Sequence, residues 1–461
     1  MKDKMKIQIK YWIIITTFMS LMGCESFIEV EAPNNQILAV DVFTTKSGAE
    51  SALADIYARI REEGVVTGNT VGGTVIMAAY SDDLIFFGTN TTLQQFANHT
   101  LIPSNTSINT IWRTTYAHIY AINAFKEGVA NSVNITEEDK SRFLGEALFL
   151  RAFLHFYLVN CYGQIPYCTS TDYTINQNIS KKSESEIYNL ILQDVTEAKE
   201  LIPEDYPTAE RVRPNKSVVD AFLARVHLYN QDWQEANDAA TAVIENQLYS
   251  WNQDIEQEFL RDNPSIIWSL HPGLPGLNTR DARSFVFASG PPTRPTLAPD
   301  LHNAFETNDF RKTAWIKTIQ GTGGPWYHAN KYKKITNTGV SEEYTILFRL
   351  AEMYLIRAEC KAMLNDLEGA KDDLNKIRNR AGIVDTGANT LQDVLQAILN
   401  ERRLELFTEQ SHRFFDLKRT GKANEVLSIV KPNWRETNRV FPLPENELLL
   451  NQNLLPQNPG Y

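Results

Sequence analysis

The stretch "SVVDAFLARVHLYNQDWQEANDAATAVIE" (Ser217–Glu245) is matched in pattern by "RLAEMYLIRAECKAMLNDLEGAKDDLNKI" (Arg349–Ile377). Both stretches place apolar residues three and four positions apart, which is the spacing of one helix face. When they are superimposed, two alanines twelve residues apart and an aspartate between them coincide: Ala224 with Ala358, Asp232 with Asp366, and Ala236 with Ala370. Each stretch is therefore predicted to form a pair of helices.

The spacing of the two alanines is similar to that of the small residues in tetratricopeptide (TPR) helix hairpins. Small residues there let two antiparallel helices approach closely. Such a unit has about 34 residues and needs neighbours to bury its core. We expect four pairs of this kind, at about 50–130, 142–202, 217–246 and 346–380.

Two segments interrupt this helical pattern, at about 64–107 and 248–343. They are rich in glycine, proline, asparagine and aromatic residues, as in "SGPPTRPTLAPD" and "GTGGPWYHANKYKK". They are too apolar for flexible linkers, so we expect loops and short strands that carry function. The predicted fold is mainly α: one compact domain with a TPR-like helical-hairpin scaffold and long insertions.

The N-terminus carries four lysines in its first ten residues, followed by an uncharged stretch from Tyr11 to Gly23. This stretch is shorter than the roughly 20 residues that cross a bilayer, and its order is that of a secretory signal. Its end, "LMGC", resembles the lipobox of bacterial lipoproteins, in which the cysteine becomes lipid-modified. We therefore expect residues 1–23 to be a signal peptide and Cys24 to be the lipid attachment site. An ordinary secretory signal with an accidental cysteine is the alternative.

The composition excludes several classes of ligand. The formal charge of −11 becomes −14 without the signal, whose net charge is +3. A chain this acidic, with no basic tract, is not expected to bind nucleic acid or to touch the membrane other than through its lipid. Eight scattered histidines and no C-x-x-C pair predict no metal site, and we expect no cofactor. Cys161 and Cys168 could pair across a short turn, although two unreactive cysteines are favoured.

Four further motifs, in chain order, resemble the SusD/RagB-like outer-membrane lipoproteins of Bacteroidetes. They are "LGEALFLRAFLHFYLVNCYGQIPY" (Leu144–Tyr167), "RLAEMYLIRAEC" with "LNKIRNRAG", "ILNERRLELFTEQSHRFFDLKRTG", and the terminal "LPQNPGY". The lipobox and the acidic leader "ESFIEVEAP" (leader about 24–48) fit the same family, so the resemblance covers 24–461.

This resemblance implies a surface-exposed, lipid-anchored protein of the outer membrane that is not an enzyme. Members bind oligosaccharides, or in some cases peptides. They deliver them to a partner SusC-like TonB-dependent transporter, over which they sit as a hinged lid. Lipidation of Cys24 is implied independently by this resemblance.

Charged residues near the C-terminus could suggest acid/base chemistry, but a structural role is favoured. The set is Glu401, Arg402, Arg403, Glu405, Arg413, Asp416 and Arg419. Arginine forks bind carboxylates in two places, so we expect an ion-pair network that locks the last helices to the core. Glu146, Arg151, Glu352 and Glu359 lie in the helix motifs and are expected to hold helices together. Trp112 and Trp233 are expected to pack in the scaffold.

The ligand site is predicted from the chemistry of sugars, which present flat C–H faces ringed by hydroxyls. A binder needs accessible aromatic rings with polar side chains around them. Two segments offer both, "AAYSDDLIFFGTN" (Ala78–Asn90) and "GGPWYHANKY" (Gly323–Tyr332). The candidate ligand-binding residues are Asp82, Phe86, Asn90, Trp326, Tyr327 and Asn330. Packing of Phe86 and Phe87 against the scaffold is the alternative for that pair.

Three functions remain open from the sequence. The favoured one is capture of an oligosaccharide, which predicts a shallow surface site with an exposed ring near Trp326 or Phe86. Capture of a peptide through backbone hydrogen bonds is the second. A protein-only TPR-like adaptor is the third. A glycosidase would need two carboxylates about 5 to 10 Å apart across a cleft, which the adjacent Asp82 and Asp83 cannot supply.

Overall fold

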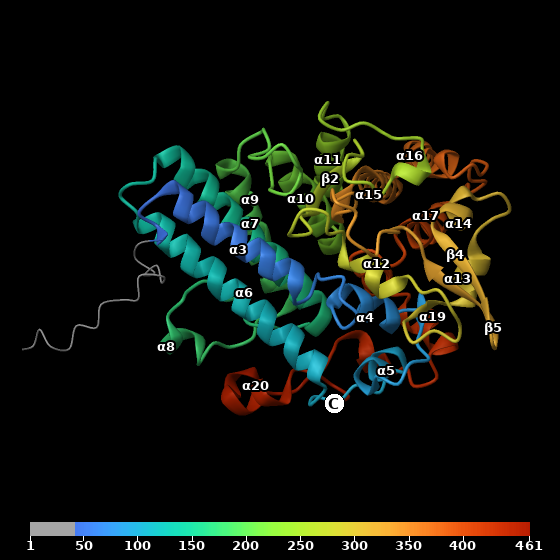
Figure 1. The fold of residues 1–461 in the computed structure, drawn as a ribbon, viewed down its shortest axis with the longest axis horizontal. Helices are drawn as coiled ribbons and strands as arrows, with labels where there is room; N and C mark the ends of the chain where they lie inside the picture. Colours follow the sequence, from blue (N-terminus) through green and yellow to red (C-terminus); the bar gives the residue numbers. More distant parts are fainter. Residues whose placement is uncertain (1–41) are drawn as a thin grey trace, which may run out of the picture.

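The computed structural model describes residues 42–461 (Figure 1). The predicted signal peptide, Cys24 and most of the predicted leader lie outside the described residues. Helices dominate and strands are few and short, which confirms the expected mainly α fold.

Antiparallel helix hairpins form the scaffold. Their bounds are α3 (Lys46–Glu62) with α6 (Thr106–Asn131), α7 (Glu137–Tyr162) with α9 (Glu184–Leu201), α10 (Lys216–Asn230) with α11 (Trp233–Ile244), and α15 (Leu350–Met363) with α16 (Leu367–Arg380). Helix α11 packs against α15, so the long insertion between them leaves the stack of hairpins continuous (Figure 1). Helix α17 (Leu391–Leu406) extends the stack on α15 and α16.

Local sequence explains where these helices begin. The hydroxyl of Ser183 accepts a hydrogen bond from Glu186 N, and the Glu186 carboxylate accepts one from Ser183 N, which is a complete capping box for α9. Asp366 caps α16 by accepting from Gly369 N at 2.9 Å. The four aligned alanines of the two similar pairs are fully buried, as close helix approach requires: Ala224, Ala236, Ala358 and Ala370.

Helix α7 forms the centre of the core. Nineteen of its residues are buried, and phenylalanines from it pack with Phe222, Trp268 and Phe348. Within residues 42–461 it is also the one helix long and apolar enough to pass as a membrane span, but 94% of its apolar window is buried inside the protein. Its apolar surface is therefore used for packing. Cys161, at its end, is a buried free thiol, and Cys168 is also free, as the favoured interpretation expected.

The first insertion contains α4 (Gly73–Tyr80), β1 (Leu84–Ile85) and α5 (Thr91–Ala97). The short helix α8 (Tyr173–Asn176) lies between α7 and α9. The second insertion holds, in order, η2 (Ile255–Gln257), β2 (Ile266–Leu270), α12 (Arg280–Phe285), β3 (Thr296–Leu297), α13 (Pro299–Ala304), α14 (Phe310–Ala314), β4 (Ile316–Gly321), β5 (Gly324–Ala329) and β6 (Thr345–Arg349).

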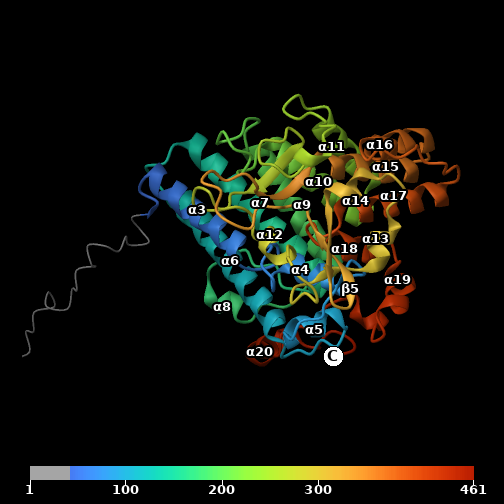
Figure 2. The same cartoon turned by 45° about the vertical axis from the view of Figure 1, so that its right-hand side comes forward.

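The strands pair as three small antiparallel sheets, β1 with β3, β2 with β6, and β4 with β5. The first of these joins the two insertions, with Leu84 opposite Leu297 and Ile85 opposite Thr296. Figure 2 shows α4, α5, α12 and the β4–β5 hairpin on the side of the molecule that faces the viewer. The two insertions thus form one surface beside the hairpin stack.

The chain ends in α18 (His412–Arg419), α19 (Ala423–Val430), η3 (Glu436–Arg439), α20 (Glu445–Leu450) and η4 (Gln452–Leu454). The terminal "NPGY" is bound to the core. The Asn458 side-chain amide donates to the carbonyl oxygens of Tyr162 and Phe441, both at 2.7 Å. The Tyr461 hydroxyl donates to Val440 O at 3.1 Å. The terminal motif therefore has a structural role, since these contacts fasten the end of the chain to the core.

Candidate functional site

The segment with Trp326 is the second strand of a β-hairpin. Strands β4 and β5 pair in register from Ile316 opposite Ala329 to Gly321 opposite Gly324. The two-residue turn, Thr322-Gly323, has Gly323 at φ +79°, a conformation that glycine adopts without strain. A strand-paired segment holds its side chains in fixed directions, which favours a preorganised site.

Trp326 is half-buried, and glycines on two sides make room for its indole. A Cβ atom at Gly290 or Gly324 would come within 2.0 or 2.5 Å of indole atoms, so each glycine permits the ring's position. The indole N–H donates to Thr322 O at 3.2 Å. The ring of Phe87 meets it edge to face, with centroids 5.0 Å apart.

Phe87 is the functional candidate that the sequence-based prediction missed. It is 53% exposed, whereas the neighbouring Phe86 is half-buried and packs against the core. The prediction chose Phe86, and the signal that separates them is alternation. Leu84 in β1 is buried, Phe86 lies on the inner side two residues later, and Phe87 faces outward. Phe87 and Trp326 therefore supply the exposed ring surface where the two insertions meet.

Tyr327 lies on the other face of the hairpin from Trp326, because successive residues of a strand point to opposite sides. Its ring stacks on His302 with centroids 3.8 Å apart and planes 14° apart. Its backbone N–H and C=O are bonded by the Thr296 hydroxyl, which links β5 to β3. One sugar ring cannot contact both Trp326 and Tyr327, and the structure gives Tyr327 a packing role.

Asp82 and Asp83 lie in a buried cluster of charges. Arg413 donates to both carboxylate oxygens of Asp82, at 2.7 and 2.8 Å, and Arg403 approaches at 2.9 Å. These arginines keep the pKa of Asp82 below its usual range despite burial. Burial and the neighbouring Asp82 charge raise the pKa of Asp83 to about 6. Both oxygens of Asp82 already have protein partners, so its predicted role as a ligand contact gains no support from the geometry.

The two asparagines of the predicted site also serve the fold. Asn90 is exposed and caps α5, its side chain accepting from Leu93 N at 3.0 Å. The Asn330 side-chain amide donates to Ala314 O at 3.2 Å, and its backbone N–H donates to Trp315 O. Asn90 stands at the edge of the Phe87 segment, whereas Asn330 lies at the base of the hairpin. Of the six predicted residues, Trp326 is the one that the structure brings against Phe87. Phe86 is next to Phe87 in the chain but packs against the core, and Asn90 is exposed three residues further on.

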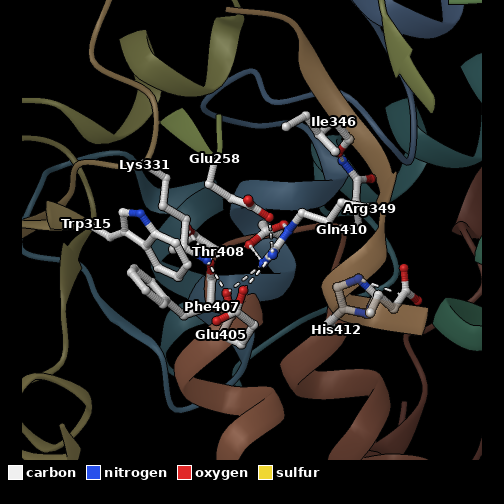
Figure 3. Close-up of polar contacts among 12 residues, drawn as sticks. Glu258, Trp315, Lys331, Ile346, Arg349, Glu405, Phe407, Thr408, Gln410 and His412 are labelled. Carbon is white, nitrogen blue, oxygen red and sulfur yellow. Dashed lines mark hydrogen bonds and ion pairs between the residues drawn. The ribbon is translucent and has the colours of Figure 1, made fainter. Parts of the chain in front are cut away.

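The C-terminal charged residues form the expected ion-pair network (Figure 3). At its centre, Arg349 donates to Glu405 at 2.6 Å, to Glu258 at 3.0 Å and to both oxygens of Glu409 at 2.8 Å. Lys331 donates to Glu409 and to two backbone carbonyls, and burial lowers its pKa to about 8. All five side chains are buried, which suits a structural lock and gives no access to substrate.

The other predicted pairs are present as well, and confirm the structural interpretation. The Arg402 guanidinium donates to Asp416, and Arg419 joins Asp416 to Glu359. Each helix-motif residue forms an ion pair with a residue outside its own helix: Glu146 with Arg213, Arg151 with Asp194, and Glu352 with Arg225. Trp112 is 3% exposed and Trp233 is half-buried, as expected of scaffold residues.

Two hollows of ligand size lie away from the hairpin. One, of about 520 Å³, lies between α6, the α8 region and α20. The other, of about 640 Å³, lies where the α10–α11 turn faces α15, α17 and α18. Within residues 42–461 there is no cluster of three or more histidine, cysteine or acidic side chains arranged to hold a metal ion.

Comparison with known protein families shows to which family the chain is related. The family described as "SusD family" matches residues 315–461, and "Starch-binding associating with outer membrane" matches residues 26–228. The chain belongs to the SusD/RagB-like family. This family is one of carbohydrate-binding proteins associated with the outer membrane.

SusD-like proteins of known sequence and structure match nearly the whole chain. SusD-like protein P2 of Formosa agariphila is 26% identical, over 98% of this chain and 100% of its own. A SusD superfamily protein of Bacteroides vulgatus superimposes with a TM-score of 0.81 at 20% identity, covering 91% of this chain and 100% of the other. A laminarin-binding SusD-like protein gives 0.74 at 25% identity, covering 90% and 99%. The fold of this chain is therefore that of the SusD-like proteins.

Proposed function

We propose that this protein binds an oligosaccharide at the cell surface through the pair formed by exposed Phe87 and half-buried Trp326. The observation that carries the proposal is the fixed, edge-to-face arrangement of these two rings where the two insertions meet. A pyranose stacks its C–H face on such a ring, while nearby polar groups bond its hydroxyls. Asn90, which is exposed three residues after Phe87, is the polar side chain that the proposal assigns to the sugar hydroxyls.

Family membership supports the ligand class. One structural neighbour is a laminarin-binding protein and another is a surface glycan-binding protein of Bacteroides fluxus. We propose that the protein binds without chemical turnover, since the carboxylates near the rings, Asp82 and Asp83, are buried among arginines.

Anchoring and delivery complete the proposal. A lipid on Cys24 would tether the domain to the outer membrane, because each buried methylene contributes about 0.8 kcal/mol and several chains give stable attachment. The tethered domain would pass its glycan to a SusC-like TonB-dependent transporter. A Cys24→Ala variant should leave the membrane fraction when the transporter is absent. In the wild type, a SusC-like barrel should copurify from detergent-solubilised outer membranes.

The ligand class is tested on an array of neutral and acidic oligosaccharides beside a panel of oligopeptides. Trp326→Ala should weaken glycan binding, and Trp233→Ala, a matched loss of a half-buried tryptophan elsewhere, should not. Unchanged glycan composition after long incubation is expected of a binding protein. Binding of oligopeptides alone would replace the glycan with a peptide, and equal binding by Trp326→Ala would refute the site.

A further inference from the structure

A hollow of about 520 Å³ lies on the edge of the molecule formed by α6, α8 and α20, and the β4–β5 hairpin lies on another side (Figure 1). One wall is a face of α6. The others are the segment from Pro166 to Ile179 and the C-terminal segment from Glu447 to Leu454. Its volume lies within the usual range of ligand pockets.

The α6 wall presents a row of aromatic side chains. Trp112, Tyr116 and Tyr120 are spaced four residues apart, so they lie on one face of the helix over about 12 Å. Trp112 is buried, with its ring 4.8 Å from that of Tyr116, while Tyr116 is half-buried and Tyr120 is 53% exposed. The row therefore runs from a buried base to an accessible aromatic surface.

Hydrogen bonds within the protein hold the other walls in place. Asn451 donates to Ile179 O at 2.8 Å, and Asn453 donates to Asn178 O at 2.7 Å, which joins the α20 segment to the α8 segment. The Tyr116 hydroxyl donates to Pro166 O at 2.8 Å. All three bonds join one wall of the pocket to another or to α6, so the protein's own hydrogen bonds fix the shape of the pocket.

Several polar groups of the lining are not used by these walls. In the part of the chain that the structure describes, the side chains of Arg113 and Gln177 have no hydrogen-bond partner. Ser170 accepts a bond from Asp172 N, which leaves its hydroxyl hydrogen free to donate. Burial raises the pKa of Glu447, and this effect outweighs the hydrogen bond with Trp112 and the positive charge of Arg113, which both lower it. Arg113 and Glu447 are the charged residues of the lining, and their charges cancel.

We infer that this pocket is a second saccharide-binding site that takes a short neutral segment of a polysaccharide, separate from the Phe87–Trp326 surface. Aromatic rings for stacking, amide and hydroxyl groups for bonding and no net charge match a neutral sugar. The inference rests on the proposed ligand class, although not on the hairpin site. Two sites on one chain would raise the affinity for a long polysaccharide above that for a short oligosaccharide.

The test is calorimetric titration of the full mature protein with neutral hexasaccharides of β-1,3-glucan, starch, xylan and mannan. It compares the wild type with Trp326→Ala, Tyr120→Ala and the double variant. Tyr173→Ala is the matched control, since Tyr173 is 74% exposed on α8 but does not line the pocket. Tyr120 is exposed, so its removal leaves the core intact, and circular dichroism and melting curves check this for every variant. Gln177→Ala provides a second, non-aromatic probe of the pocket.

The inference predicts that Trp326→Ala retains binding of a hexasaccharide that the double variant binds at least tenfold more weakly. The Gln177→Ala change in the Trp326→Ala background should also weaken binding, and the Tyr173→Ala change should not. If Trp326→Ala abolishes all binding, the pocket is not a saccharide site and the hairpin site stands. The same conclusion follows if Tyr120→Ala, added to Trp326→Ala, has no further effect. If Tyr120→Ala alone abolishes binding, the pocket stands and the hairpin site fails. If the wild type binds none of these neutral hexasaccharides, the pocket inference is refuted, and the hairpin site is refuted with it only if no oligosaccharide of the array binds either.

Discussion

The ring of Phe87 meets the ring of Trp326 edge to face, with centroids 5.0 Å apart and planes at 78°. Phe87 follows β1 in the first insertion, and Trp326 lies in β5 of the second. The two insertions come together because β1 pairs with β3, and Thr296 of β3 bonds Tyr327 of β5. The aromatic surface thus depends on pairing between segments that are far apart in the sequence.

Removal of Phe87 should weaken glycan binding although Trp326 remains. Phe87→Ala deletes one exposed ring and the edge contact that orients the indole, so we expect a loss of about fivefold, or roughly 1 kcal/mol. The effects of Phe87→Ala and Trp326→Ala should be non-additive, because the two rings touch. A double-mutant cycle by calorimetry measures this, and strict additivity would show that the rings act independently.

Tyr327→Ala should affect stability more than binding. The variant loses the stack on His302 and leaves the opposite face unchanged, so we expect the free energy of unfolding to fall by about 2 kcal/mol. The glycan affinity should change by less than about threefold. Urea unfolding and calorimetry measure the two quantities. A large loss of affinity at unchanged stability would instead restore Tyr327 as a ligand contact.

Arg349→Met should destabilise the protein strongly, because it removes from the interior the cation that pairs with all three of Glu405, Glu409 and Glu258. Breaking a buried ion pair from one side costs about 3–5 kcal/mol. The control is Arg59→Met, which breaks an exposed pair with Asp55 and should cost less than about 1 kcal/mol. Urea unfolding of both variants checks the contrast, and equal losses would contradict a buried structural lock.

Asp83 should make stability depend on pH. Its pKa of about 6 in the folded state lies above its ordinary value of 3.8, so the folded state holds this proton more tightly than the unfolded state. The contribution of Asp83 to stability is therefore present at low pH and is lost as the pH rises from about 4 to about 6. Asp82, Arg403, Arg413 and Lys431 surround it and set the background.

An Asp83→Asn variant lacks this titration. Relative to the wild type, it should gain stability as the pH rises from 4 to 7, because only the wild type then has a buried charge to ionise. The attraction between Asp83 and Arg403 grows as Asp83 ionises, and it is already included in the folded-state pKa of about 6. Unfolding free energies at four or five pH values measure the difference between the two proteins, and a constant difference would contradict the raised pKa.

The sequence predicted the scaffold well because helices are set by local patterns. Apolar spacing and caps such as Ser183 and Asp366 specify each helix, and the paired alanines predict close approach. The roles of Glu405 and Asp416 were also predictable, since arginine and carboxylate residues alternate along the motifs that contain them.

The candidate site was predicted only in part, because it depends on contacts between distant segments. Adjacent aromatics in "PWYHA" gave no sign that β4 pairs with β5 and so turns Trp326 and Tyr327 to opposite faces. No residue near Asp82 in the sequence indicates that it pairs with Arg413, because Arg413 lies far along the chain. The pocket beside Tyr120 was missed for the same reason, as α20 reaches it from the end of the chain.

The most direct test of the central claim is a titration of the best glycan from the array into two proteins that both carry Tyr120→Ala, so that the hairpin site alone is measured. One of them also carries Trp326→Ala, and a third protein with Trp233→Ala in the same background is the control. We expect Trp326→Ala to weaken binding at least tenfold and Trp233→Ala to leave it within twofold, about 1.4 kcal/mol against less than about 0.4 kcal/mol. Equal affinity in all three proteins would contradict a glycan site at Trp326.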